Sequence, residues 1–269
     1  TNTNTMKGKG ISRMAVKQVI YNIPGYLMME ESLQRVALLI GEDGINRLQN
    51  STVLVVGIGG VGSYCVEALA RSGIGNIILV DGDDIAPSNL NRQIHAVYDS
   101  IGKSKTEVMK ERVLSYQKNC NIKTFDMFYN KEVNQKIFIE KIDFVVDAID
   151  TISCKLDLIE ICKEKDIPFI SSLGMANRFD PTQIEITDLS KTEYDPLAKA
   201  MRTQVRKREI KGKIPVIFSK EHPFVQHQII EEDALTRKEK MPPASMCFVP
   251  ATAGLTCASY VVKKILENK

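Results

Sequence analysis

The chain has 269 residues, of which 43% are hydrophobic and 26% are charged. That length suits one large α/β domain or two small ones, and the hydrophobic content predicts a sizeable buried core. The net charge of +3 is too small to indicate a nucleic-acid-binding protein by itself, and DNA is not expected as a partner. The six cysteines include no C-x-x-C pair, so neither structural zinc nor a disulfide framework is expected, and reduced thiols suggest a cytoplasmic setting.

The two ends of the chain differ from its middle. Residues 1–27 have no clear period and no signal-peptide pattern, and we interpret them as an N-terminal extension that is either flexible or foreign to the protein. A single domain is then expected over residues 28–269. The apolar run 248–262 is shorter than the ~20 residues of a membrane span and contains Pro250 and Gly254, so it predicts a buried helix. Peripheral membrane association is the less favoured alternative.

Between these ends, short apolar runs alternate with helical patterns. Apolar side chains recur at spacings of three and four, which predicts helices at 30–48, 61–72, 103–118 and 152–165. Runs rich in β-branched residues predict buried parallel strands at 52–56, 77–80, 142–146 and 168–171. This alternation predicts the α/β class, with a doubly wound, Rossmann-type, mainly parallel sheet and ligands at the carboxyl ends of its strands.

The pattern changes after Asp180. Residues 182–187 alternate between apolar and polar side chains, which predicts a half-exposed strand, and 216–218 predict another short strand. Residues 220–250 are expected to form a long loop. The C-terminal part is therefore predicted to add a region of strands and helices to the sheet.

A glycine-rich loop, Gly57-Ile-Gly-Gly-Val-Gly62, follows the first predicted strand and opens the next helix. Gly57 permits a tight turn, Gly59 and Gly60 let the backbone approach a phosphate, and Gly62 lets the helix pack closely on the sheet. The exposed amides and the helix dipole favour an anion. Asp81 ends the second strand 19 residues after Gly62, where its carboxylate can accept hydrogen bonds from ribose hydroxyls. A glycine-rich turn without a ligand is the weaker alternative.

Two further motifs distinguish ATP from NAD. A triphosphate carries about four negative charges, and its transfer from water requires fixed cations beyond a helix terminus. Arg92 in Ser88-Asn-Leu-Asn-Arg-Gln93 and Lys105 in Gly102-Lys-Ser-Lys105 would supply them. A dinucleotide site needs no such pair, although Lys105 taken alone is equally typical of a solvated helix lysine.

Asp150 lies between a predicted strand and a predicted helix, and two interpretations are equally open. As a helix N-cap, its side chain would accept a backbone hydrogen bond, a role in which Asp is common. As a magnesium ligand, it would use the same position at the carboxyl end of a strand, next to the phosphates.

The ordered set of motifs resembles the ThiF/MoeB/HesA superfamily, whose members are relatives of ubiquitin-activating enzymes. The set comprises V-V-G-I-G-G-V-G-S, D-G-D-D-I, S-N-L-N-R-Q, G-K-S-K and D-A-I-D, within roughly residues 31–264. The resemblance implies that ATP and magnesium are bound by Gly60, Asp81, Asn89, Arg92, Lys105 and Asp150. It also implies a homodimer, in which Arg35 reaches the ATP of the neighbouring subunit.

Within the superfamily, residues 180–198 resemble the subgroup of tRNA threonylcarbamoyladenosine dehydratases. The resemblance implies an enzyme that adenylates the threonyl carboxylate of a modified adenosine in tRNA, after which the side chain closes into a ring. The zinc-binding cysteine pairs usual in MoeB- and ThiF-like relatives are missing, which favours the same subgroup. Sulfur-transfer proteins are candidate partners, and a bound monovalent cation is compatible with the resemblance.

This reaction is chemically consistent without a carrier thiol. A carboxylate is a poor electrophile because oxide is a poor leaving group. When the carboxylate oxygen is joined to AMP, AMP becomes a good leaving group. Arg92, Lys105 and magnesium would stabilise the charge that develops on the phosphates. The carbamoyl nitrogen lies on the same side chain, so its attack is intramolecular and gains from proximity. Cys247 is interpreted either as a reactive thiol or as a small buried apolar residue, and no cysteine is expected to be essential.

Residues 199–213 are locally basic, with seven basic residues and one acidic residue. Apolar side chains repeat every four positions from Leu197 to Val205, which predicts an amphipathic helix that presents its arginines outward. The arginines predicted to contact the phosphates of tRNA are Arg202, Arg206 and Arg208. A solvated basic helix face is the alternative.

Three other functions compete with this hypothesis. An adenylating enzyme for a sulfur-carrier or ubiquitin-like protein would need a groove for a Gly-Gly tail, and usually a thiol and zinc. A nucleotide-binding module without catalysis is disfavoured by the intact Arg92, Lys105 and Asp150. An NAD-dependent oxidoreductase is disfavoured by the two cations.

Overall fold

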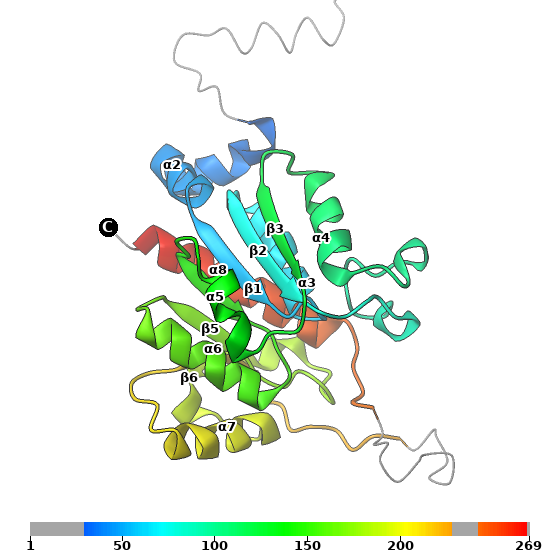
Figure 1. The fold of residues 1–269 in the computed structure, drawn as a ribbon. Coiled ribbons are helices and arrows are strands. Elements are labelled where there is room, and N and C mark those ends of the chain that lie inside the picture. Colours follow the sequence, from blue (N-terminus) through cyan, green and yellow to red (C-terminus); the bar gives the residue numbers. More distant parts are fainter. Residues whose placement is uncertain (1–29, 228–241, 268–269) are drawn as a thin grey trace, which may run out of the picture.

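The computed structural model describes residues 30–227 and 242–267. In this part of the chain, seven strands form one sheet in the order β3-β2-β1-β4-β5-β7-β6 (Figure 1). All neighbours pair in parallel except β6, which runs antiparallel to β7 at the edge. The α/β class and the doubly wound, mainly parallel sheet predicted from the sequence are confirmed.

Six of the seven strands lie close to their predicted positions. The four central strands are β1 (Thr52–Val56), β2 (Asn76–Asp81), β4 (Phe144–Asp147) and β5 (Phe169–Ser172). The added C-terminal pair is β6 (Ile184–Asp188) and β7 (Pro215–Ser219). The edge strand β3 (Asn121–Asp126) was not predicted, because exposed polar side chains such as Lys123 interrupt its apolar pattern.

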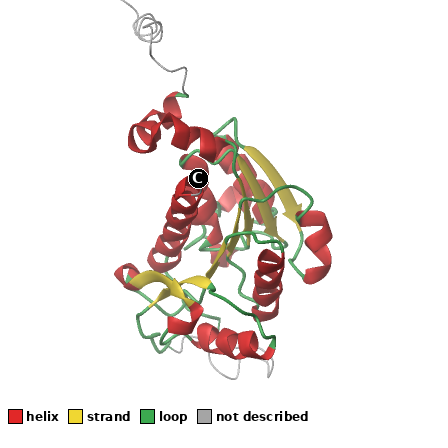
Figure 2. Ribbon diagram, turned by 90° about the vertical axis from the view of Figure 1, so that its left-hand side faces the viewer, coloured by secondary structure: helices red, strands yellow, loops and turns green. Residues whose placement is uncertain are grey.

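Helices cover both faces of the sheet (Figures 1 and 2). One face packs against α2 (Gln34–Gln49), α3 (Gly62–Arg71), α4 (Lys105–Leu114) and α8 (Phe248–Glu267). The other face packs against α5 (Asn134–Ile137), α6 (Ile152–Glu164) and α7 (Pro196–Lys207). Short 3₁₀ turns are η1 (Glu31–Leu33), η2 (Pro87–Asn89), η3 (Tyr98–Ser100), η4 (Lys131–Val133), η5 (Pro181–Gln183) and η6 (Leu189–Lys191).

Strand β1 shows why the sheet needs both layers of helices. Val53 and Val55 pack into the cluster under α3 and α8, whereas Leu54 and Val56 pack into the cluster under α6. All four side chains are almost fully buried, and burial of one such side chain contributes about 1.5–3 kcal/mol. This is why the strand reads as a continuous apolar run rather than an alternating one.

The predictions for the two ends have different outcomes. The extension predicted at 1–27 lies outside the described residues, as do residues 228–241 of the predicted loop; residues 220–227 and 242–247 contain neither helix nor strand. The apolar run at 248–262 forms most of α8 and is buried along Val249, Ala253 and Cys257, as predicted. Within the described residues, we find no helix with the length and apolarity to cross a membrane.

Candidate active site

A cavity of about 740 Å³ opens at the carboxyl ends of the parallel strands. Its walls come from the glycine loop after β1, from residues that follow β2, from residues 148–151 after β4, and from residues 172–176 at the end of β5 and beyond it. The strand order reverses between β1 and β4, and in open α/β sheets such a reversal creates a crevice for a ligand. The volume lies in the range usual for small-molecule sites.

Most of the predicted site residues meet in this cavity. Its lining contains eight of them: Gly57, Gly59, Gly60, Asp81, Asn89, Arg92, Lys105 and Asp150. Gly62 and Arg35 do not line it. Residues that the sequence analysis did not assign also contribute, above all Gln93 and Phe128, and the segment before α8 adds Pro243 and Ser245.

Two glycines of the loop leave no room for a side chain. Gly57 has a φ of 89°, and a Cβ there would lie 2.5 Å from the carbonyl oxygen of Ala148. A Cβ on Gly62 would lie 1.8 Å from the carbonyl oxygen of Gly57, so this glycine allows the close packing that was predicted without touching the cavity. At Gly59 the nearest atom to a Cβ would be Gln93 Nε2 at 3.9 Å, which leaves the loop backbone accessible for an anion.

Asp81 holds the glycine loop in place. Its Oδ2 accepts a hydrogen bond from the Ile58 amide at 2.6 Å, and its Oδ1 accepts one from the Asp83 amide at 2.9 Å. Each carboxylate oxygen keeps a further acceptor position. Asp81 therefore connects β2 to the loop after β1, in addition to the predicted acceptance of ribose hydroxyls.

The two predicted cations are both held at the cavity. Lys105 begins α4 with its side chain buried, and its Nζ lies 2.7 Å from Asp83 Oδ2. This burial contradicts the alternative of a solvated helix lysine. Arg92 is half-buried, and its Nη1 donates to the Ser88 carbonyl oxygen at 2.7 Å and to Asn91 Oδ1 at 3.0 Å. Fixed cations of this kind cost little reorganisation when an anion binds.

Buried polar groups continue the cation-bearing motif. Asn89 Oδ1 accepts a hydrogen bond from the Ala86 amide at 3.0 Å. Gln93 lines the cavity and is 5% exposed, and its buried Oε1 has no partner among the described residues. His95 is also buried; burial, with Lys105 and then Arg112 nearby, lowers its pKa to about 4, so the imidazole is neutral at pH 7.

Asp150 is exposed at the rim of the cavity, directly after β4. The N-cap of α6 is Thr151, so the N-cap interpretation of Asp150 is wrong. Within the described residues, Asp150 makes no hydrogen bond or ion pair, and no cluster of three or more His, Cys, Asp or Glu side chains could hold a metal ion. Coordination of magnesium by Asp150 stays a prediction, since a single carboxylate can act together with phosphate oxygens.

The other aspartate of the D-A-I-D motif is buried. Asp147 Oδ2 accepts from Lys155 Nζ at 3.0 Å and from Ser171 Oγ at 2.5 Å, and its Oδ1 accepts from the Ile149 amide at 3.1 Å. The side chains of Lys155 and Asp147 are at most 1% exposed. This network links β4, β5 and α6 and holds the turn that carries Asp150.

Arg35 lies away from the cavity. It is exposed on α2, which also exposes Leu38 and Leu39, and α2 bends at Gly41 where φ is 75°. The contact with ATP implied by the family resemblance therefore requires a second copy of the chain.

The cysteines differ in their surroundings. Cys247 is half-buried with its Sγ 2.9 Å from the Tyr64 hydroxyl, and burial together with this contact raises the pKa of Tyr64 to about 12. Cys257 is fully buried, and burial raises its pKa to about 12, so its thiolate is not accessible at pH 7. Cys154 lines the cavity.

The predicted basic helix exists as α7, with Met201 fully buried and Leu197 half-buried on its inner face. The outward orientation predicted for Arg202 is wrong: it is half-buried and donates to the Thr192 carbonyl oxygen at 3.0 Å. Its guanidinium group is therefore bound to an acceptor within the chain.

Arg208 is also occupied by a contact within the chain, because its Nη1 lies 2.5 Å from Asp157 Oδ1 and 3.3 Å from Glu160 Oε2. Arg206 is exposed as predicted and has no ion pair among the described residues. Of the three arginines, Arg206 is therefore the one that remains available to an external phosphate.

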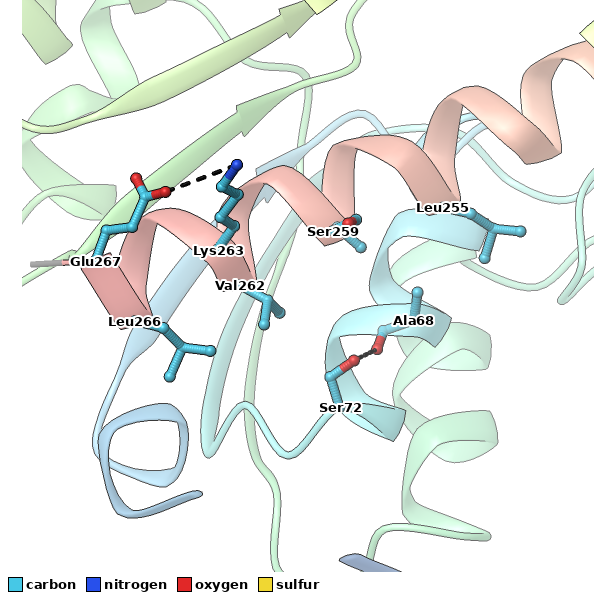
Figure 3. A pocket seen from close by; sticks show the side chains of 9 residues that line it. Ala68, Ser72, Leu255, Ser259, Val262, Lys263, Leu266 and Glu267 are labelled. Atoms are coloured by element: carbon cyan, nitrogen blue, oxygen red, sulfur yellow. Dashed lines mark hydrogen bonds and ion pairs between the residues drawn. The ribbon is translucent and has the colours of Figure 1, made fainter. Parts of the chain in front are cut away.

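A second hollow, of about 470 Å³, runs between α3 and α8 (Figure 3). Leu255, Val262 and Leu266 of α8 line it, and Lys263 pairs with Glu267 at 3.8 Å. It shares no residue with the cavity at the carboxyl edge, and its lining contains no glycine and one basic residue, Lys263. The carboxyl-edge cavity is therefore the candidate nucleotide site.

Comparison with known proteins agrees with this assignment. The model of the ThiF family matches residues 32–269. The chain belongs to the ThiF family. This ThiF-family chain is 45% identical over 245 residues to the tRNA threonylcarbamoyladenosine dehydratase of Bacillus subtilis, covering 89% of this chain and 96% of the relative. The Escherichia coli enzyme of the same name is 36% identical over 247 residues, covering 86% of this chain and 92% of that relative.

A solved structure shares the fold of the ThiF-family chain. It is the crystal structure of E. coli tRNA N6-threonylcarbamoyladenosine dehydratase in complex with ATP, which superposes with a TM-score of 0.77 at 35% identity. The match covers 90% of this chain and 97% of the other. The resemblance drawn from the motifs is thus confirmed at the level of the family and its subgroup.

Proposed function

We propose that the chain is an ATP-dependent tRNA threonylcarbamoyladenosine dehydratase, which adenylates the threonyl carboxylate of the modified adenosine and closes it into a ring. One observation carries the proposal: a glycine loop, Arg92 and a buried Lys105 meet in one cavity of a chain that matches relatives of that name over nearly their whole length. The ATP complex of the E. coli enzyme supports the assignment of ATP.

The residues of the cavity fit a nucleoside triphosphate. We assign the phosphates to the glycine loop, Arg92 and Lys105, and the ribose to Asp81 and Asn89. Lys105 already faces the carboxylate of Asp83, so ATP would replace or share this partner. Asp150 is assigned to magnesium, an ion that screens phosphate charge when it is bound.

Ring closure then needs two displacements. A carboxylate oxygen of the substrate attacks the α-phosphorus of ATP, and pyrophosphate leaves. The carbamoyl nitrogen attacks the acyl carbon, the bond to AMP breaks, and the nitrogen loses its proton. Arg92 and Lys105 stabilise the charge that develops on the phosphates, and the second step is intramolecular. No thiol takes part.

A sulfur-carrier or ubiquitin-like substrate is the less supported candidate. Such an enzyme usually transfers the acyl group to a thiol. Cys257 is fully buried and is therefore no open nucleophile, whereas Cys247 is half-buried against the Tyr64 hydroxyl. Sulfur-transfer partners and a bound monovalent cation rest on the family resemblance alone, whereas the tRNA substrate supports a cytoplasmic location.

We further propose a homodimer with Arg35 acting in trans. Leu38 and Leu39 on the same helix are 89% and 85% exposed, which is unusual for large apolar side chains unless another surface covers them. The apolar hollow between α3 and α8 lies on the neighbouring helix, because α2 contacts α8. A second copy would cover this surface and bring Arg35 to an ATP site.

For the tRNA backbone, we propose contacts from Lys199, Arg206 and Lys207 of α7, which are exposed and have no ion pair in the described part of the chain. Removal of Arg206 and Lys207 should reduce the slope of log affinity against log salt by about 2, one unit for each lost phosphate contact. Lys118→Ala is the control, since Lys118 is exposed before β3 at the opposite edge of the sheet. An unchanged slope would place the tRNA on another surface.

The function is tested with tRNA that carries threonylcarbamoyladenosine. The purified protein with ATP and magnesium should convert it to a product that lacks one water, detected by mass spectrometry of the digested RNA. Lys105→Ala is the matched inactive control. If the wild-type protein leaves the modified tRNA unchanged but adenylates a protein carboxyl terminus, the proposal is wrong.

A further inference from the structure

Four exposed rings form two pairs, and one pair lies on segments that also line the nucleotide cavity. Phe179 and Phe248 meet edge to face, with ring centroids 6.1 Å apart, and Tyr194 lies against His222 at 3.8 Å. Phe179, Tyr194 and Phe248 are 55%, 53% and 50% exposed. Large rings displayed to this extent in one region mark a binding surface rather than core packing.

The two phenylalanines are close to the cavity along the chain. Phe179 follows Ala176, a cavity-lining residue, by three positions. Phe248 lies between Ser245 and Pro250, which both line the cavity. A ligand that reaches into the cavity from this side would therefore pass the pair of phenylalanines.

A buried arginine fixes the backbone beneath these rings. Arg178 Nη1 donates to the Glu221 carbonyl oxygen at 2.8 Å, and its Nη2 lies 3.5 Å from Asp195 Oδ2. The side chains of Arg178 and Asp195 are at most 1% exposed. Glu221 Oε2 in turn accepts from the amide of Phe179 at 2.9 Å.

This network touches three of the ring-bearing segments. Phe179, Tyr194 and His222 are the sequence neighbours of Arg178, Asp195 and Glu221, respectively. Tyr194 also has a φ of 53°, which is unfavourable for a residue with a side chain and persists only where the surroundings hold it. The rings are thus preorganised for display, although they contribute little to the core.

We propose that Phe179, Phe248, Tyr194 and His222 form a stacking platform for unpaired bases of the tRNA loop that carries the modified adenosine. The proposal rests on the proposed function and specifies how its substrate is recognised. The reactive carboxylate is attached to a base, which must leave the stack of its loop before it can enter the cavity. Aromatic rings replace the lost base stacking, as they do in proteins that bind single-stranded RNA.

The charge around the platform matches such a ligand. Tyr194 directly precedes the N-cap of α7. The exposed Lys199 therefore lies about one helical turn beyond Tyr194, on α7. Rings beside unpaired cations are the combination that binds bases and backbone of a single strand together. Each of four rings on separate segments can stack on one of several successive bases. A protein tail offers no such row of bases.

The test is a double-mutant cycle between one ring and one base. The intact RNA probe is a synthetic stem-loop that contains threonylcarbamoyladenosine. In two further probes, the nucleotide on the 5′ side or the 3′ side of the modified adenosine is abasic. Full-length wild-type protein, Phe179→Leu and Tyr194→Leu are titrated against each probe by fluorescence anisotropy. Phe179→Trp keeps a stacking ring, and Tyr98→Leu removes an 83% exposed ring on η3, outside the cavity lining.

We expect each leucine variant to bind the intact probe about fivefold or more weakly, since stacking on one ring accounts for at least that ratio. For at least one leucine variant, one of the abasic probes should bind no more weakly than the intact probe. The missing base is then the one that stacked on the missing ring. Phe179→Trp and Tyr98→Leu should bind like the wild type, and ATP affinity should not change in any variant.

Binding by the ring variants and conversion of the modified tRNA by the wild-type protein are measured separately. If wild-type protein converts the modified tRNA while both leucine variants bind it within twofold of wild type, the platform is refuted and the function stands. The platform is equally refuted if the losses from ring and base simply multiply for both rings. If wild-type protein neither binds nor converts the RNA, the proposed function is refuted and the platform with it.

Discussion

The exposed Asp150 allows activity to be separated from folding. Its side chain makes no hydrogen bond or ion pair within the described part of the chain, and Thr151 rather than Asp150 caps α6. Substitution Asp150→Asn removes one charge and preserves shape. We therefore expect the free energy of unfolding in urea to change by no more than about 0.5 kcal/mol, as for other surface substitutions without partners.

Activity should respond quite differently. If Asp150 holds magnesium against the phosphates, loss of its charge weakens the binding of the ion. The negative charge that develops on the leaving pyrophosphate is then less stabilised. We expect kcat/KM to fall about 100-fold or more, which corresponds to about 2.7 kcal/mol in the barrier. The assay is ATP–pyrophosphate exchange with modified tRNA over a series of magnesium concentrations, and higher magnesium should recover part of the rate in the variant.

Two matched variants sharpen this test. Asp84→Asn changes an exposed carboxylate that does not line the cavity and should leave both rate and stability unchanged. Asp147→Asn should instead lose about 3–5 kcal/mol of stability, because it leaves Lys155 charged and buried without its partner. An Asp150→Asn protein that keeps its exchange rate within twofold of wild type throughout the magnesium series would refute the assignment.

Three further predictions concern the dimer, the thiols and a buried histidine. Arg35→Ala and Asp150→Ala subunits, each inactive alone, should recover exchange activity when mixed, because a hybrid dimer contains one intact site; no recovery despite proven subunit exchange would exclude action in trans. Changing Cys247 and Cys257 together to Ser should keep ring closure within about tenfold, or ~1.4 kcal/mol, whereas a complete block with accumulated acyl-adenylate would identify a carrier thiol. His95 has a folded pKa of about 4, below its ordinary value of 6.5, so its contribution to stability is complete above pH 6.5 and decreases by up to about 3 kcal/mol as the pH falls through 4. Urea unfolding of His95→Leu should lack this decrease, and parallel pH curves for variant and wild type would contradict it.

Local features of the sequence were enough to predict the central sheet. The strands β1, β2, β4 and β5 are buried on both faces and are therefore continuous apolar runs. Each run can be recognised from its own residues, without knowledge of the neighbouring strands. The glycine loop was equally predictable, because the turn at Gly57 and the packing at Gly62 depend on residues a few positions apart and on the strand before them.

Contacts between distant segments were not predictable. Arg202 and Arg208 belong to a basic stretch, yet their partners, Thr192 and Asp157, lie on other elements and are unknown until the chain folds. The burial of Lys105 depends in the same way on β2 and on the loop that holds Asp83. The aromatic platform likewise joins four segments, and no spacing in the sequence signals that their rings gather.

In the proposed reaction, this cavity activates a carboxylate of modified tRNA with ATP. Exchange of labelled pyrophosphate into ATP, measured with purified protein and tRNA that carries or lacks threonylcarbamoyladenosine, tests it most directly. We expect exchange with the modified tRNA, none with the unmodified tRNA, and a rate that falls at least about 100-fold in Asp150→Asn. Exchange that is equally fast without any tRNA, or that appears only with a protein carboxyl terminus, would contradict it.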